Sequence, residues 1–479
     1  MATIKFGALG FDKFYNVING ELKETAATRH SINPATSDPN PEVPLSTPID
    51  VEEAIAAARA AFPGWAKTQW VARRDAILQF AGALEKNTDD FATLLTREQG
   101  KPPQIALGEI ANGIRWLRGI ANLDLPSEVV NKDATTQIVI KYVPLGVSVA
   151  IVPWNYPVML ACGKIAASLL TGNSIILKVS PFTPYCGLKM AELAQSFFPA
   201  GVFQALSGDD RLGPWLTSHP GIDKISFTGS TATGKKVMES ASKNLTRVTL
   251  ELGGNDAAIV CSDADIDSAV PKIATLSFLN SGQICVAIKR VYVHESIYNE
   301  FRDKIVAYTR SIQVGVEKDA FMGPLQNKVQ YDRVQEHLDD IKRQNYHVPT
   351  GNHDFQTVGY FINPTIVDNP ADDSRIVQEE PFGPILPLLS WSNEEEVIRR
   401  ANSSCMGLGA SVWSTDPGVA ARIAEHLEAG SVWINSHLDI EPNIPFAGHK
   451  SSGIGCEWGV EGLKGFCNIK AIYFKQDMP

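Results

Sequence analysis

The first half of the chain alternates short apolar runs, rich in β-branched residues, with longer segments of helical length. The sequence predicts strands at 147–152, 174–178, 202–206, 224–227 and 248–252. Helices are expected between them at 160–170, 184–198, 211–218 and 231–242. A strand–helix order repeated in this way predicts a parallel sheet covered on both faces, which is a nucleotide-binding architecture.

A second series of alternating elements follows and predicts a second α/β domain. Its strands are expected near 257–262 and 289–294 and, at the end of the series, near 432–435. Two alternating patterns, Thr136–Tyr142 and Lys470–Lys475, lie outside both series. We expect these two to form a small separate sheet.

Helical sequence precedes the first series. Asp50–Glu53 has the pattern of a capping box, with apolar residues at helical spacing behind it. Pro63–Gly64 is expected to end this helix. More helical sequence runs from Ala72 to about Ala121.

The composition suits a protein that handles small molecules. A chain of 479 residues is too long for one hydrophobic core. The net charge of −10 argues against nucleic acid or an anionic membrane as a partner, and no apolar run is long enough to span a bilayer. The seven cysteines show neither CxxC nor paired Cys/His spacing. We therefore expect no metal site, no disulfide framework and a cytoplasmic location.

Cys285 and Glu251 are suited to nucleophilic and base chemistry. Cys285 follows the turn Asn280–Gly282, which ends a helix predicted from Asp265 to about Leu279, so a loop position is expected. An exposed thiol of lowered pKa attacks carbonyls, whereas a small buried cysteine is inert. Glu251 ends an apolar strand, where burial raises a carboxyl pKa toward that of a general base. A solvated glutamate at a strand end is the alternative.

Further polar positions follow other predicted strands. Asn155 directly follows a strand and could donate to an oxyanion, although turns also favour asparagine. Phe227–Gly234 joins a strand to a helix, and its glycines and hydroxyls suit either a phosphate site or a helix N-cap. Lys178, which closes a strand, and Glu380 are ambiguous by themselves.

Taken together, these motifs resemble the NAD(P)-dependent aldehyde dehydrogenase superfamily. The match runs from Ile18 to the end of the chain, and the motifs occur in the family's order. They are Pro153-Trp-Asn155, Phe227-Thr-Gly-Ser230, Leu250-Glu-Leu-Gly-Gly254, Gly282-Gln-Ile-Cys285, Glu380-Pro-Phe-Gly-Pro384, Gly430-Ser-Val-Trp-Ile-Asn435 and Pro445-Phe-Ala-Gly448.

The resemblance implies a mechanism for three of these residues. The Cys285 thiolate would attack the aldehyde carbon, and the Asn155 amide and the Cys285 backbone N–H would hold the oxyanion of the thiohemiacetal. Hydride transfer to the nicotinamide would leave a thioester, which Glu251 would hydrolyse by activating water.

The resemblance also implies the cofactor contacts. Lys178 would contact the adenosine ribose, Ser230 the pyrophosphate and Glu380 the nicotinamide ribose. Phe382 would pack near the nicotinamide. Further cofactor contacts are expected at Trp154, Gly208 and Gly229.

The fold implied is α/β with three parts. A Rossmann-like cofactor-binding domain would comprise 1–121 and 145–253, and a catalytic α/β domain 254–453. Segments 122–144 and 464–479 would form a small oligomerisation β-sheet. A homodimer or homotetramer is therefore expected.

Departures from the family's pattern bear on the cofactor. Many NAD-preferring members carry a glutamate three residues after the cofactor lysine, and Pro181 stands there in this chain. A carboxylate at that point would repel a 2′-phosphate, so its absence leaves NADP open and NAD only slightly favoured. Pro381 is expected to have little effect, and Ala447 replaces a glycine usual beside the pocket.

The expected substrate is an apolar or aromatic aldehyde. By position, the substrate pocket should be mostly apolar and offer no arginine for a carboxylate. Asp439 and Glu441, if they face the pocket, would disfavour acidic substrates. The residues expected to line it are Tyr156, Leu160, Ile284, Val286, Ile440 and Phe446.

Two other functions fit the same pattern. In an acylating dehydrogenase coenzyme A, not water, would resolve the thioester, but such enzymes commonly lack the base found here as Glu251. A non-catalytic member of the fold would usually have lost the nucleophile, and Cys285 is present.

Overall fold

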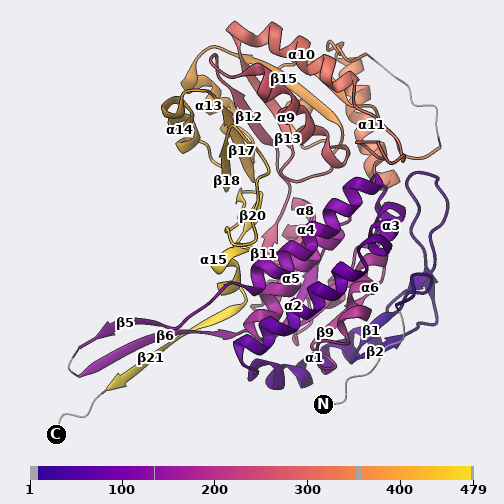
Figure 1. The fold of residues 1–479 in the computed structure, drawn as a ribbon, viewed down its shortest axis with the longest axis vertical. Coiled ribbons are helices and arrows are strands. Elements are labelled where there is room, and N and C mark those ends of the chain that lie inside the picture. The colour runs from indigo at the N-terminus through magenta and orange to yellow at the C-terminus, as the bar shows by residue number, and fades with distance from the viewer. Residues whose placement is uncertain (1–8, 134, 352–357, 476–479) are drawn as a thin grey trace.

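The computed structural model describes residues 9–133, 135–351 and 358–475, which form two lobes and a slender arm (Figure 1). The outermost parts of the predicted domains, 1–8 and 476–479, lie outside the described residues. Within the described residues no helix combines the length and apolarity needed to cross a membrane.

An eight-stranded sheet forms the lobe drawn lower in Figure 1. Its strands β9, β8, β7, β10 and β11 are parallel, with β7 at the centre. The apolar runs of these strands are almost entirely buried, as expected where helices cover both faces. In sheet order the strands are β2 (Glu21–Lys23), β1 (Asn16–Ile18), β9 (Phe203–Leu206), β8 (Ser174–Lys178), β7 (Val147–Ile151), β10 (Lys224–Thr228), β11 (Arg247–Glu251) and β20 (Gly453–Ile454).

Helices cover this sheet on both sides. One hydrophobic core joins the sheet to the helices α2–α6, and another joins it to α1, α7 and α8. The helices are α1 (Pro48–Ala66), α2 (Trp70–Lys86), α3 (Thr88–Gln99), α4 (Pro103–Ala121), α5 (Pro157–Thr171), α6 (Tyr185–Ala194), α7 (Leu212–Thr217) and α8 (Thr231–Ser242).

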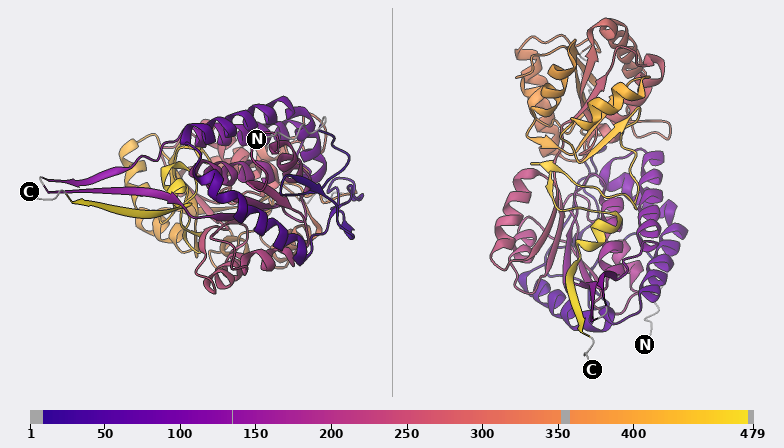
Figure 2. Two further views of the ribbon diagram at one scale, coloured as in Figure 1. Left: turned by 90° about the horizontal axis from the view of Figure 1, so that it is seen from below. Right: turned by 90° about the vertical axis from the view of Figure 1, so that its left-hand side faces the viewer.

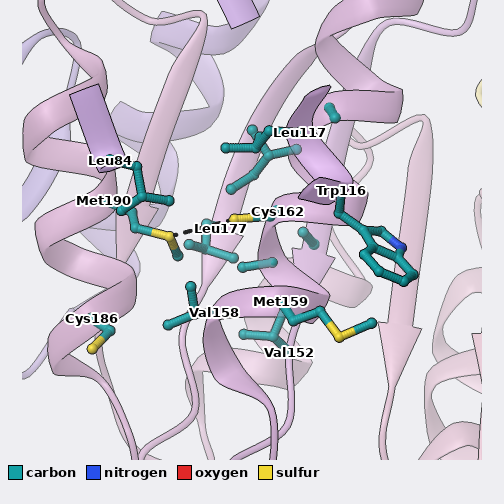
Figure 3. Packing of buried hydrophobic residues seen from close by; sticks show 14 of the residues in the cluster. Leu84, Trp116, Leu117, Val152, Val158, Met159, Cys162, Leu177, Cys186 and Met190 are labelled. Atoms are coloured by element: carbon teal, nitrogen blue, oxygen red, sulfur yellow. Dashed lines mark hydrogen bonds between the residues drawn. The ribbon is translucent and has the colours of Figure 1, made fainter. Parts of the chain in front are cut away.

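The core beside α5 reaches toward the functional site. Figure 3 shows side chains from α2, α4, α5, α6 and β8 interdigitating here, with Cys162 Sγ 3.9 Å from Met190 Sδ. Trp116 and Met159 belong to the same cluster. Both also line the cavity described below, so the core forms one of its walls.

The second lobe contains a six-stranded, fully parallel sheet. Its order is β14 (Thr365–Asp368), β15 (Ile385–Trp391), β13 (Ile288–His294), β12 (Asp256–Val260), β17 (Gly409–Trp413) and β18 (Ser431–Ile434). One face packs against α9 (Ile266–Phe278) and α10 (Tyr298–Arg310). The other packs against α11 (Lys328–Arg343), α12 (Arg375–Gln378), α13 (Glu394–Asn402) and α14 (Pro417–Glu425).

The two outlying strand patterns pair with each other, as the sequence predicts. After α15 (Gly459–Lys464), β21 (Cys467–Lys475) pairs antiparallel with β6 (Thr136–Pro144) along its whole length. β5 (Glu128–Lys132) adds a third strand on the other side of β6. This three-stranded arm projects away from both lobes (Figure 2).

Short elements complete the fold. Two-stranded pairs form between β3 (Thr28–Arg29) and β4 (Val43–Pro44) and between β16 (Met406–Gly407) and β19 (His449–Lys450). Turns of 3₁₀ helix lie at Leu279–Gly282 and Glu295–Ile297.

Both predicted ends of the first helix are wrong. The helix starts at Pro48, three residues early, because Thr47 is the N-cap and forms the capping box with Asp50. It also continues past Pro63 to Ala66. Trp65 holds this last turn, since it is buried and its indole N–H donates to the Leu169 carbonyl at 3.1 Å. Tertiary packing therefore offsets the backbone hydrogen bond that the proline cannot make.

Candidate active site

The candidate residues gather where the parallel strands of the first sheet end. Because the carboxyl ends of parallel strands lie at one edge, segments distant in sequence meet there. Trp154 and Asn155 follow β7, Lys178 ends β8, Gly208 follows β9, Gly229 and Ser230 follow β10, and Glu251 ends β11. From the second lobe come Cys285, on a turn before β13, and Glu380 and Phe382, before β15.

The turn that presents Cys285 has an unusual backbone. Asn280, Ser281 and Gly282 all have positive φ, at 53°, 58° and 73°. Left-handed conformations strain residues that carry a Cβ, so the turn persists only where its surroundings hold it. A hydrogen bond of 2.7 Å from Ser281 Oγ to the Gly323 carbonyl oxygen does so.

The double glycine after Glu251 lets two segments approach each other. A Cβ at Gly254 would lie 2.3 Å from the Cys285 carbonyl oxygen, and one at Gly253 would lie 2.4 Å from Glu380 Oε2. Glycine at 254 is therefore needed for the backbone of the cysteine turn to reach the end of β11, and glycine at 253 leaves room for the Glu380 carboxylate where it lies.

Lys289 anchors the cysteine turn. Its Nζ donates to the carbonyl oxygens of Ile284 at 2.6 Å and Cys285 at 2.9 Å, and it pairs with Glu380 at 3.2 Å. Cys285 itself is half-buried, and burial raises the pKa of its thiol to about 12, although Lys289 opposes this shift. In this state the thiol therefore needs a base to take its proton.

Asn155 is held from both its side chain and its backbone. One N–H of its amide donates to the Gln283 carbonyl at 2.9 Å, which fixes the amide plane and leaves the second N–H for another acceptor. Its own carbonyl accepts from Lys101 Nζ at 2.7 Å and from Asn280 Nδ2 at 3.3 Å. Lys101 is fully buried and pairs with Glu109, so a buried ion pair supports this backbone.

Glu251 occupies a desolvated position. Its side chain is 4% exposed, and neither carboxyl oxygen has a hydrogen-bond partner among the described residues. Burial, and next the negative charge of Glu457, raise its pKa well above the usual range, while Lys164 opposes the shift. Glu457 and Lys164 form a buried ion pair, and Ser226 Oγ donates to Glu457 at 2.6 Å.

The expected cofactor contacts form two groups. Trp154 and Phe382 touch edge to face with ring centroids 5.4 Å apart, and Glu380 accepts from the Gly254 backbone N–H at 3.3 Å. The second group lies where the adenosine is expected. It contains Lys178, which is buried, and burial lowers its pKa to about 8. Arg29 donates to the Pro181 carbonyl, which brings an arginine to the point where the family's glutamate is missing.

The segment expected to contact the pyrophosphate forms the start of α8. Ser230 is exposed and caps α8, with its Oγ accepting from the Thr233 N–H at 3.2 Å. A Cβ at Gly229 would lie 2.6 Å from the Phe227 ring, and one at Gly208 would lie 2.9 Å from Leu212. Glycine at these two positions therefore leaves room for the Phe227 and Leu212 side chains where they lie.

A cavity of about 300 Å³ joins the three candidate catalytic residues. Cys285, Glu251 and Asn155 all line it, as do all six residues expected for the substrate pocket: Tyr156, Leu160, Ile284, Val286, Ile440 and Phe446. The further lining residues are Asn112, Arg115, Trp116, Met159, Thr228, Leu279, Leu438, Asp439, Glu441, Glu457 and Trp458.

Several lining residues were missed from the sequence, and one expectation about the lining is wrong. The pocket was expected to contain no arginine, but Arg115 of α4 lines it and pairs with Glu441. Trp116, Phe446 and Trp458 form an aromatic cluster, with ring centroids of neighbouring pairs 4.8–5.0 Å apart. Helical spacing marked Arg115 and Trp116 only as parts of a helix, and nothing local points them at a substrate.

The described residues contain no group of three or more His, Cys, Asp or Glu side chains placed to hold a metal ion.

Comparison with known proteins points to one family. The model of the aldehyde dehydrogenase family matches residues 22–472. Similar proteins include an aldehyde dehydrogenase of a Fusarium species, 40% identical over 467 residues that cover 97% of this chain and 99% of that protein. A mitochondrial aldehyde dehydrogenase of Leishmania tarentolae is 36% identical over 470 residues, covering 96% of this chain and 93% of that protein.

Solved structures agree with these relatives. The NAD⁺ complex of an aldehyde dehydrogenase from Bacillus cereus superposes with a TM-score of 0.95 at 33% identity, covering 99% of this chain and 100% of that one. An NADP-dependent enzyme of Escherichia coli also gives a TM-score of 0.95, at 32% identity over 97% of this chain and 99% of that one.

Proposed function

The chain belongs to the aldehyde dehydrogenase family, and we propose that it oxidises an apolar or aromatic aldehyde to the carboxylic acid through a thioester on Cys285 that water hydrolyses. Membership makes it an oxidoreductase that acts on aldehydes with NAD(P). The observation that supports the finer proposal is that Cys285, Glu251 and Asn155, from three distant segments, line one cavity.

Glu251 and Cys285 are matched for proton transfer. Because burial raises the pKa of both groups, a carboxylate at this position is a stronger base than in water, and the thiol requires one. Glu251 accepts the thiol proton as sulfur attacks the aldehyde carbon. The π electrons of the carbonyl then move to its oxygen, which gives the oxyanion of a thiohemiacetal.

The Asn155 amide stabilises that oxyanion. Its first N–H is occupied by the Gln283 carbonyl, so the second is held in a fixed direction. One donor placed in this way accelerates acyl chemistry by ~10²–10³. As the oxyanion collapses, the former aldehyde carbon loses its hydrogen as hydride, and the regenerated carbonyl is that of a thioester. Glu251 passes the thiol proton to solvent and can then take a proton from the water that attacks the thioester, which releases the acid and the Cys285 thiolate.

The strand-end residues fit a dinucleotide, which when bound supplies the hydride acceptor of the reaction. Lys178 and Ser230 would hold its adenosine and pyrophosphate, and Glu380 the nicotinamide ribose. Gly208 and Gly229 lie in turns where a Cβ would meet a neighbouring side chain, so the backbone of both turns can lie close to this edge of the sheet. Phe382 would pack near the nicotinamide, and Trp154 would lie against the bound dinucleotide.

We propose that NAD is only slightly favoured over NADP, because charges of both signs lie at the adenosine end. The cation Arg29 beside Pro181 favours a 2′-phosphate. Asp210, whose charge is the largest influence opposing the lowered pKa of Lys178, disfavours it. The two effects act in opposite directions.

The substrate class follows from the lining of the cavity. Trp116, Phe446 and Trp458 pack together, and seven other lining residues are aliphatic: Met159, Leu160, Leu279, Ile284, Val286, Leu438 and Ile440. A Cβ at Gly163 would lie 2.8 Å from Trp458 Nε1, so a glycine on α5 makes room for this indole. An aromatic or long aliphatic aldehyde would bury its apolar surface there.

The domain division, the location and the self-association of the chain also belong to the proposal. The three-part division is supported by the two sheets and the arm, with the catalytic part ending near Ile434, since β20 pairs with β11 of the first sheet. The seven free thiols suit the proposed cytoplasmic location. Self-association is supported by the exposed arm.

The test is cofactor reduction with an aldehyde panel, for the native enzyme, Cys285→Ala and Glu251→Gln. We expect activity without coenzyme A in the native enzyme and none in Cys285→Ala. Glu251→Gln should turn over slowly, because both thiol deprotonation and thioester hydrolysis need the base, and acyl-enzyme that forms in it should persist as an acyl mass increment on the intact chain. Acid release that requires coenzyme A would favour the acylating reaction, and no reduction with any aldehyde would favour a non-catalytic protein.

A further inference from the structure

An ion pair spans the solvent end of the cavity. Arg115 of α4 pairs with Glu441 of the loop 435–445, and both residues line the cavity. Their side chains are 45% and 52% exposed, whereas Glu251 and Cys285 lie deeper. An aldehyde entering from solvent would pass this pair before it reaches the thiol.

The loop is seated firmly on α4. Gly119 lies one helical turn after Arg115, on the same face, and a Cβ there would lie 2.2 Å from Pro442 Cγ. Arg115 Nη2 also lies 3.5 Å from the Ile440 carbonyl oxygen, and Trp433 Nε1 donates to the Asp439 carbonyl at 3.0 Å. Glu441 is therefore held opposite Arg115 by the packing of its neighbours.

The charges at this end of the cavity are unbalanced. Among the lining residues Arg115 is the cation, and Glu441 neutralises it. Asp439, also exposed, adds a negative charge. Exposed ion pairs contribute little to stability, so the fold does not depend on this one. Its larger effect is on the potential that a charged substrate meets.

We propose that Glu441 is a specificity-determining residue: by neutralising Arg115 it excludes aldehydes that carry a carboxylate at their far end and keeps the enzyme selective for uncharged ones. This rests on the proposed oxidation of aldehydes at Cys285. Without the charge of Glu441, Arg115 becomes a receptor for the carboxylate of such a substrate, since a guanidinium binds carboxylates through paired hydrogen bonds.

The experiment compares para-carboxybenzaldehyde with para-methylbenzaldehyde, a pair of similar shape. The ratio of kcat/KM, carboxylate over methyl, is measured for the native enzyme, Glu441→Gln, Asp439→Asn and the double variant Glu441→Gln/Arg115→Met. We expect the ratio to rise about tenfold in Glu441→Gln and at most about twofold in Asp439→Asn. Asp439→Asn is the matched control, since it removes one negative charge but leaves the Arg115–Glu441 pair.

The double variant assigns the gain to the arginine, and in it the ratio should return to about the native value. An unchanged ratio in Glu441→Gln would overturn the proposal. An equal rise in Asp439→Asn would do so too, by showing a general charge effect, as would a native enzyme that already prefers the carboxylate. Oxidation of neither aldehyde, nor of any other in the panel, would instead indicate failure of the proposed function.

Discussion

The acid–base properties of Glu251 depend on neighbours that are distant in sequence. Its carboxyl is buried without a hydrogen-bond partner among the described residues, and Glu457 adds a like charge nearby. Both effects disfavour the ionised form, so the base form of Glu251 develops only as the pH rises. Activity that depends on this base should therefore increase with pH.

Replacing Glu457 with glutamine should move the rising limb of the pH–rate profile to lower pH, by about one unit. The substitution removes the like charge and leaves Lys164 unpaired, and both changes favour the ionised form of Glu251. Loss of the buried pair should also lower stability by roughly 3–5 kcal/mol, measured by denaturant unfolding.

Ser226→Ala is the control for Glu457→Gln, because it removes a hydrogen bond to Glu457 but keeps the charge. Its profile should stay near that of the native enzyme. A profile of Glu457→Gln that does not move, or that moves to higher pH, would contradict the electrostatic account.

Two single substitutions should change the cofactor preference in opposite directions. Arg29→Met removes the cation beside Pro181 and should lower kcat/KM for NADP about tenfold, with a much smaller effect for NAD. Asp210→Asn removes a negative charge near Lys178 and should raise the NADP to NAD ratio several-fold. Steady-state rates with each dinucleotide measure both; shifts in the same direction would refute the assignment.

At the level of the elements, buried carboxylates satisfy the first N–H groups of two helices, and one of them supports the candidate residue Asn155. Glu109 accepts from the first backbone N–H groups of α5, at Val158 (2.9 Å) and Met159 (3.3 Å), while Lys101 connects it to the Asn155 carbonyl. Glu98 plays the same part at α6, where burial raises its pKa to about 7. Carboxylates at these positions also interact favourably with the helix dipoles.

Replacing Lys101 with methionine should lower both stability and kcat. Breaking a buried ion pair leaves Glu109 uncompensated, at a cost of roughly 3–5 kcal/mol. The double variant Lys101→Met/Glu109→Gln carries no unpaired charge, so it should regain much of the stability. Its kcat should stay low, because Asn155 still lacks its lysine anchor. Denaturant unfolding and rates at saturating aldehyde separate the two effects; full recovery of kcat would show a purely structural role.

At the scale of the whole molecule, the three-stranded arm exposes apolar side chains that a partner would cover. β21 is exposed along nearly all its length, and Ile469 and Tyr473, which share one face of it, are 71% and 65% exposed. On β5, Val129 and Val130 are each 55% exposed. Apolar groups gathered on a thin sheet indicate an association surface.

The double variant Ile469→Lys/Tyr473→Lys should therefore reduce the mass of the particle in solution toward that of the monomer, measured by sedimentation equilibrium. Val329→Lys is the matched control, because Val329 is 72% exposed on α11, away from the arm. A native chain that is already monomeric, or a double variant of unchanged mass, would refute the role of the arm.

The sequence alone was enough to predict both α/β series, the separate sheet, the family and the strand-end positions of the candidate residues. These features leave local signals in the sequence: runs of β-branched residues in strands, apolar residues at helical spacing in helices, and glycines in the turns that follow them. The helix 231–242 coincides with α8, and the predicted 265–279 helix differs from α9 by one residue at each end, with Asp265 as its N-cap.

Only the tertiary structure decided what surrounds those residues. Lys101, Lys289 and Glu457 carry no local mark of their long-range contacts. These contacts, with the Asn155 carbonyl, Glu380 and Lys164 respectively, are made to segments that the fold brings near. Arg115 was missed for the same reason: its position on α4 can be predicted, but its pairing with Glu441 requires the loop to pack on Gly119. Burial, pKa and charge balance depend on distances in space, which the order of residues does not specify.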